Sequence, residues 1–140
     1  MARKPLSGFG IVTEVNKHLT ADKVTVTLRV FNETRQDIKL DFQYWPVHDV
    51  VIRDKEGKEI WRESHGRFYT QNVSTATIPP SITVKKGKPH IFECTWNLTD
   101  NDKKRVGSGK YTVEGVVNST PYAMKANTIV EAGFKVLDKK

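Results

Sequence analysis

A length of 140 residues fits one domain, 1–140, and the single cysteine, Cys94, excludes an internal disulfide or a multi-cysteine zinc site. Only 37% of the residues are hydrophobic, but three Trp, four Tyr and six Phe supply large apolar units for a core. The net charge of +7 raises the question of nucleic acid, but the basic residues are scattered or lie in short turn clusters, which argues against such a partner.

Alternation of apolar and polar residues predicts a series of half-buried strands, because successive side chains of a strand point to opposite faces. The clearest case places Val24, Val26, Leu28 and Val30 on one face. In chain order the predicted strands are an edge strand over 11–15 and further strands over 24–30, 38–42, 50–52, 60–61, 92–96, 111–117 and 130–136. No segment longer than about eight residues has a helical period.

Polar and glycine-containing turns separate these strands, at 32–35, 54–58, 86–88 and 100–102. Gly57 is expected in the left-handed conformation within a hairpin connection over 54–58. About seven to nine short strands with regular turns predict an all-β fold, an immunoglobulin-like antiparallel β-sandwich. Because no linker, repeat or low-complexity tract interrupts the chain, we expect one domain over 1–140.

Motifs for catalysis, metal binding or cofactor binding are missing from the sequence. The four histidines form no His-Glu-x-x-His pair: His18, His48, His65 and His90. Ser64 and His65 are neighbours, and adjacent strand residues point to opposite faces, which disfavours a nucleophile and base. Asp100 to Asp102 lacks the remainder of a calcium loop and is better interpreted as a polar turn. We therefore expect no enzyme activity, no metal site and no cofactor.

Targeting signals are also missing. No run approaches the roughly 18 apolar residues of a membrane span, and the basic start lacks the apolar stretch of an export signal. We expect a cytoplasmic protein as the sequence stands, and an exported one if the natural protein carries a signal peptide that this sequence lacks.

Several segments occur in an order that is typical of a known family. The sequence Val-Val-Ile-Arg-Asp-Lys-Glu-Gly-Lys-Glu-Ile-Trp-Arg over 50–62 is followed by Tyr-Thr-Gln over 69–71 and by Gly87. The series continues with Phe-Glu-Cys-Thr-Trp over 92–96, Asp-Asn-Asp over 100–102, Val106 and Gly-Lys-Tyr-Thr-Val over 109–113. The ordered set covers about residues 24–117 and resembles the BsuPI family of intracellular proteinase inhibitors. The resemblance implies an immunoglobulin-like sandwich that inhibits intracellular subtilisin-type serine proteases.

Two features depart from the family pattern. Tyr69 stands where the family usually has Phe before Thr-Gln. Between positions 71 and 87 the chain is about five residues longer, and the longer stretch contains Pro79 and Pro80. Binding residues are therefore not carried over through that stretch, and matched core residues such as Trp96 support the fold more than the activity.

Two loops meet the requirement of an inhibitor, which offers a rigid extended segment and so loses little conformational entropy on docking. The first combines aromatic residues with a proline: Tyr44, Trp45, Pro46 and Val47. The second is extended by a diproline of polyproline-like geometry: Ile78, Pro79, Pro80 and Ser81. Alternatively, Trp45 folds back as a lid over the core, and the diproline stretch is a rigid connector between the sheets.

Two functions are compatible with these features. The first is a proteinase-inhibitor-like domain that binds a subtilisin-type serine protease through its exposed loops. The second is a non-inhibitory immunoglobulin-like module that binds another protein or a component of the cell envelope. The target protease and the oligomeric state are not predicted.

Overall fold

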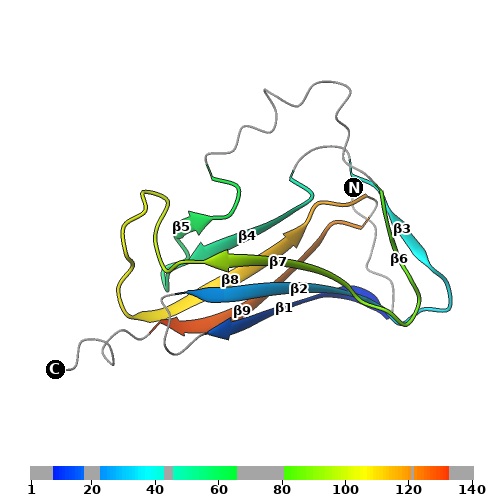
Figure 1. Ribbon diagram of the computed structural model, residues 1–140, viewed down its shortest axis with the longest axis horizontal. Coiled ribbons are helices and arrows are strands. Elements are labelled where there is room, and N and C mark those ends of the chain that lie inside the picture. The colour runs from blue at the N-terminus through cyan, green and yellow to red at the C-terminus, as the bar shows by residue number, and fades with distance from the viewer. Residues whose placement is uncertain (1–7, 18–22, 43–45, 66–80, 121, 133–140) are drawn as a thin grey trace, which may run out of the picture.

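The computed structural model of the chain describes residues 8–17, 23–42, 46–65, 81–120 and 122–132. These residues form nine strands and no helix (Figure 1). The strands are β1 (Phe9–Lys17), β2 (Val24–Asn32), β3 (Ile38–Leu40), β4 (His48–Arg53), β5 (Glu59–Arg62), β6 (Ile82–Val84), β7 (His90–Trp96), β8 (Gly109–Val117) and β9 (Met124–Ala132).

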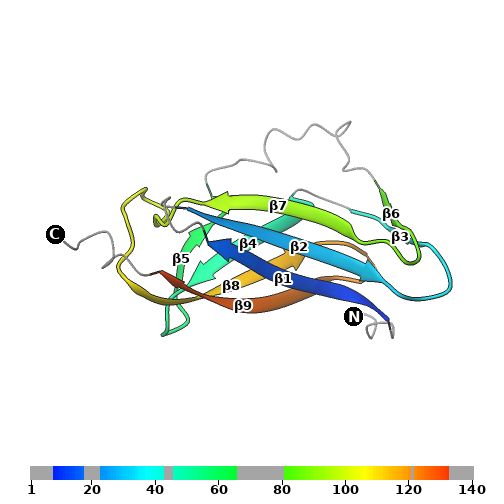
Figure 2. The same ribbon diagram turned by 60° about the horizontal axis from the view of Figure 1, so that its bottom comes forward.

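The strands form two larger antiparallel sheets and one small one. The first sheet has the order β1-β2-β7, and the second has the order β5-β4-β8-β9. These two sheets lie face to face, with β1 beside β9 at one side of the sandwich (Figure 2). The third sheet pairs β3 with β6 at one end of the sandwich (Figure 1). The structure therefore confirms the predicted all-β antiparallel sandwich.

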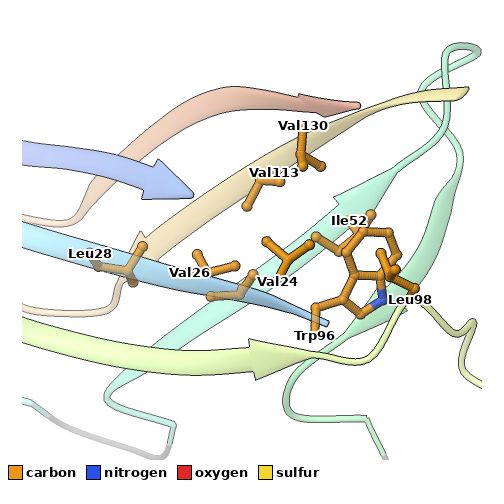
Figure 3. Close-up of a cluster of buried hydrophobic side chains, with 9 residues drawn as sticks. Val24, Val26, Leu28, Ile52, Trp96, Leu98, Val113 and Val130 are labelled. Carbon is orange, nitrogen blue, oxygen red and sulfur yellow. The ribbon is translucent and has the colours of Figure 1, made fainter. Parts of the chain in front are cut away.

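The two-residue rhythm of the sequence builds the core between the sheets. Val24, Val26, Leu28 and Val30 of β2 are each at most 1% exposed, whereas the residues between them are only half-buried. The side chains of Val24, Val26 and Leu28 pack with those of Ile52, Val113 and Val130 from the second sheet (Figure 3). Apolar area removed from water in this way is the main stabilising contribution to folding.

Trp96 at the end of β7 closes one end of this core. Its side chain is fully buried, and the indole Nε1 donates a hydrogen bond to the carbonyl oxygen of Thr99 at 2.8 Å. The ring of Tyr111 meets it edge to face, with 5.7 Å between the centroids. The Tyr111 hydroxyl in turn donates to the carbonyl oxygen of Gly107 at 2.6 Å, which is the tyrosine corner typical of immunoglobulin-like sandwiches.

Burial also changes the acidity of this tyrosine. It raises the pKa of the Tyr111 hydroxyl above its ordinary value, and the carboxylate of Asp54 adds to the effect. The phenol therefore stays protonated and keeps its role as a hydrogen-bond donor.

The predicted turns are also confirmed. Gly57 has φ = +86° in the hairpin between β4 and β5, and Gly87 has φ = +75° between β6 and β7. The Asp100 carboxylate accepts the amides of Asp102 and Lys104 at 2.8 and 2.9 Å. Those two bonds are what a polar turn requires, and they give this aspartate a local structural role.

Most strands extend one or two residues beyond their predicted ends, and β3 ends at Leu40 instead of at residue 42. The larger differences concern β9 and β6. β9 begins at Met124, six residues before the predicted start at Val130, because its inner face begins with the less regular series Met124, Ala126 and Thr128. Pairing with β8 over the whole of β9 supplies the stability that the pattern lacks. Phe134 and Val136 lie outside the described residues. The short strand β6 follows the diproline stretch and was not predicted.

The two sheets pack tightly at Gly115 of β8, which lies against Leu28 of β2 and Thr13 of β1. A Cβ atom at Gly115 would overlap the side chain of Leu28 and lie 2.6 Å from the Thr13 hydroxyl oxygen. That hydroxyl donates to the carbonyl oxygen of Ala126 at 2.8 Å and so joins the edge strands β1 and β9. A larger residue at this position requires the side chains of Leu28 and Thr13, or the strands that carry them, to shift.

The substitution Gly115→Ala is expected to lower the free energy of unfolding by about 1–3 kcal/mol, because the added methyl group displaces the packed side chains of Leu28 and Thr13 or the strands that carry them. Gly107→Ala is the matched control, since nothing lies within 4 Å of its added Cβ atom. That control is expected to stay within about 0.5 kcal/mol of the wild type. Chemical denaturation measures both values, and equal losses in the two variants would contradict the packing described.

Candidate functional site

Only some of the predicted binding residues belong to the part of the chain that the structure describes. Pro46, Val47 and Ser81 belong to the described residues. The others lie outside them: Tyr44, Trp45, Ile78, Pro79 and Pro80. What the structure describes is therefore the root of each loop, meaning the residues from which the chain enters and leaves segments 43–45 and 66–80.

Asp41, which precedes segment 43–45, is bonded to Ser81, which follows segment 66–80. Its backbone exchanges two hydrogen bonds with Thr120, at 3.3 and 2.8 Å. Its carboxylate accepts a hydrogen bond from the hydroxyl of Ser81 at 2.8 Å. The pairing of β3 with β6, in which Leu40 is opposite Ile82, brings these two residues together. Segment 43–45 thus starts beside the point where segment 66–80 ends.

Asn118 holds the other root of the first loop. Its backbone amide donates to the carbonyl oxygen of Val47, and its side-chain amide donates to that of Pro46, both at 2.9 Å. The Val47 side chain is 8% exposed and packs in the same cluster as Phe42. The short stretch that follows β8, from Asn118 to Thr120, therefore ties down both sides of segment 43–45.

Asp49 holds the root that precedes segment 66–80, because it is bonded to Ser64. Its side chain is 5% exposed and lies at the start of β4. One carboxylate oxygen accepts the backbone amides of Val50 and Ser64, at 3.0 and 3.1 Å. The other accepts the Ser64 hydroxyl at 2.6 Å and the Arg62 guanidinium at 3.0 Å. The residues just before segment 66–80 are thereby fixed to the residues just after segment 43–45.

Arg62 extends this cluster to a second carboxylate. Its guanidinium donates to both oxygens of Glu59, at 2.9 and 3.2 Å. The hydrogen bond from Arg62 lowers the pKa of Glu59, and the bond to Glu59 raises that of Arg62. Both groups are therefore charged near neutral pH, and the Arg62 charge balances the buried carboxylate of Asp49.

Ser64 and the described histidines are not arranged as a nucleophile and a base, and the contacts of Ser64, His48 and His90 are with neighbouring side chains of the fold. His48 lies 3.6 Å from a Glu63 oxygen and stacks on Phe92. Burial lowers the pKa of His90. The hydroxyl of Ser64 donates to Asp49, and His65 is exposed. His18 lies outside the described residues.

Two further features are absent from the described part of the chain. No group of three or more His, Cys, Asp or Glu side chains is arranged there to hold a metal ion. The same residues include no helix of the length and apolar character needed to cross a membrane.

The polar contacts at the loop roots were not predicted from the sequence. One signal was available at Asp49, because a carboxylate directly before the apolar run Val50 to Ile52 is drawn into the interior with it. A buried charge requires a partner of opposite charge, and Arg62 follows one hairpin later. The serines at positions 64 and 81 carry no such signal.

Comparisons with known proteins gave a family match and a match to a solved structure. The family model described as BsuPI, intracellular proteinase inhibitor, matches residues 11–122. The chain also resembles the crystal structure of Spo0M, a sporulation control protein from Bacillus subtilis, at 13% identity and a TM-score of 0.46. That match covers 90% of this chain and 49% of the other, so this chain spans about half the length of that structure. A search of curated proteins gave no match.

Arg62→Ala is expected to lower the free energy of unfolding by about 1–3 kcal/mol near neutral pH, because it removes the positive charge that pairs with the buried Asp49 carboxylate among the described residues. Arg29→Ala is the control. It breaks an ion pair with Glu14 in which both side chains are more than 40% exposed, and costs about 0–1 kcal/mol.

The same variant has an expected pH dependence. Arg62 lowers the pKa of Glu59 in the folded chain, so this contribution to stability is present above the ordinary value of 4.5. It is lost as the pH falls through the lowered value. The stability difference between wild type and Arg62→Ala therefore shrinks in acid, and denaturation between neutral pH and pH about 3 measures it. A difference that grows in acid would contradict the assignment.

Proposed function

The chain belongs to the BsuPI family of intracellular proteinase inhibitors, and we propose on this premise that it inhibits a subtilisin-type serine protease through its two rooted loops. The observation that carries the proposal is the family match over residues 11–122. The geometry of the loop roots gives it a physical basis, because both loops are fastened to the same end of a rigid sandwich.

Rigid roots favour inhibition for an entropic reason. A protease cleft binds an extended segment, and ordering a flexible one costs free energy that reduces the affinity. The bonds of Asp41 and Asp49 hold the ends of both loops before any partner arrives. A protease–inhibitor interface buries about 800 Å² on each partner, which two neighbouring loops supply.

The proposed contact residues divide into two groups. Tyr44, Trp45, Ile78, Pro79 and Pro80 belong to the segments between the roots, where large apolar groups serve as anchors. Pro46, Val47 and Ser81 belong to the roots. Val47 packs inward, so its proposed contribution is to support the first loop from below. The positive net charge of the chain favours a protease with an acidic surface around its cleft.

Titration of a subtilisin-type protease with the pure chain tests the proposal. Residual activity on a peptide substrate is expected to fall in a saturable way and to reach its minimum near equimolar ratios. A heat-unfolded sample of the same chain is the control for simple substrate competition. Undiminished protease activity beside an uncleaved chain would reject the proposal and favour a non-inhibitory protein-binding module.

The substitution Trp45→Ala distinguishes the two interpretations of Trp45, as a binding anchor and as a lid over the core. As an anchor, Trp45 contributes more than about 2 kcal/mol of binding, so the inhibition constant rises about 30-fold or more while the thermal midpoint is kept. As a lid over the core, the same change lowers the thermal midpoint. Trp45→Phe retains an aromatic ring and is the matched control. Our proposal predicts the first result, and an unchanged inhibition constant would contradict it.

A further inference from the structure

We infer that Asp49 is a positioning residue for inhibition, whose buried carboxylate fixes the roots from which both loops leave the sandwich. This inference rests on the proposed function. Asp49 itself lies too deep to contact a protease, because its side chain is only 5% exposed. Its effect must therefore pass through the residues that it holds, Val50, Arg62 and Ser64.

The Asp49 carboxylate accepts a hydrogen bond from the backbone just beyond the last backbone pair of β4 and β5. The paired residues of β4 and β5 nearest the loops are Val51 and Arg62, and one more backbone bond joins the Glu63 amide to the Val50 carbonyl. Beyond that point the next amide, that of Ser64, bonds to the side chain of Asp49 at 3.1 Å. The chain thus remains fixed to β4 for one residue more than the backbone ladder provides.

A charged group is needed for this arrangement. The two oxygens of Asp49 accept four hydrogen bonds, from two backbone amides, one hydroxyl and one guanidinium. An asparagine has one acceptor oxygen, and its amide nitrogen would face the Arg62 guanidinium with a donor. Bonds to an ionised acceptor are stronger than neutral ones, and in a buried place they hold one geometry firmly.

Asp49 also lies between the two loops along the chain. Residues 46 and 47 separate segment 43–45 from the start of β4, and Ser64 and His65 precede segment 66–80. Loss of the carboxylate therefore loosens the end of one loop and the beginning of the other together. The core cluster includes Val50 and Ile52 of β4 as well, so the residues of β2 and β8, which make no bond to Asp49, are the ones that report whether the core stays intact.

The chain offers a matched control at the other end of the same strand. Asp54 follows β4 directly, and its carboxylate accepts the backbone amides of Glu56 and Lys58, at 3.0 and 2.9 Å. Asp54→Asn makes the same chemical change as Asp49→Asn and also weakens a turn. It leaves the loop roots intact, because the 54–58 hairpin is at the opposite end of β4.

The test measures inhibition of a subtilisin-type protease by the wild type, Asp49→Asn and Asp54→Asn, together with the thermal midpoint of each. We expect Asp49→Asn to raise the inhibition constant about tenfold or more, and Asp54→Asn to change it less than about twofold. Equal inhibition constants in the two variants would overturn the inference. If Asp49→Asn does not fold, Ser64→Ala removes only the hydroxyl bond to Asp49 and is expected to weaken inhibition about threefold to tenfold. Unchanged inhibition by Ser64→Ala would then overturn it.

Native-state hydrogen exchange of the Ser64 and Val50 amides separates this inference from the proposed function. Faster exchange at these two amides in Asp49→Asn, with unchanged exchange in β2 and β8, supports the positioning role even if the wild type inhibits no protease. In that case the proposed function fails and the inference on the loop roots stands. Unchanged exchange at Ser64 overturns the inference, whatever the wild type inhibits.

Discussion

The close contact of Leu28 in β2 with Gly115 in β8 constrains how the two sheets of the sandwich pack against each other. Leu28 occupies the space that a side chain at Gly115 would fill, so the two sheets lie close together at this point. β8 then continues into Asn118 and Thr120, whose bonds hold the first loop, and β4 runs alongside it with Asp49 at its start. The apolar contact at the centre and the polar contacts at the loop roots are therefore successive parts of one framework.

The loop roots use polar chemistry where the sandwich core uses apolar area. Two aspartates, each paired with a serine from the other loop's root, connect four points of the chain that lie far apart in sequence. Such bonds contribute to stability, and they also restrict the directions in which the chain leaves the sheets at the loop roots. Under the proposed function this restriction favours binding, because a preorganised segment binds with a smaller loss of entropy.

The sequence predicts the strands better than the site for a physical reason. Alternation is a local property, and it located β2, β7 and most of β8, as well as Gly57 in its turn. β6 and the first half of β9 were not predicted, because their apolar faces are short or weakly apolar and the strands are stabilised by pairing with β3 and β8. The bonds of Asp41 and Asp49 to their serines span 40 and 15 residues, and no local pattern predicts such pairs.

The central claim is that recognition takes place at the rooted loops and nowhere else on the sandwich. Hydrogen–deuterium exchange of the chain, alone and with an equimolar amount of an inactivated subtilisin-type protease, tests it most directly. The account predicts slower exchange confined to residues 41–47 and 78–82 and their immediate supports. Slower exchange along the outer faces of β1, β2 and β7, with the loops unaffected, would contradict it.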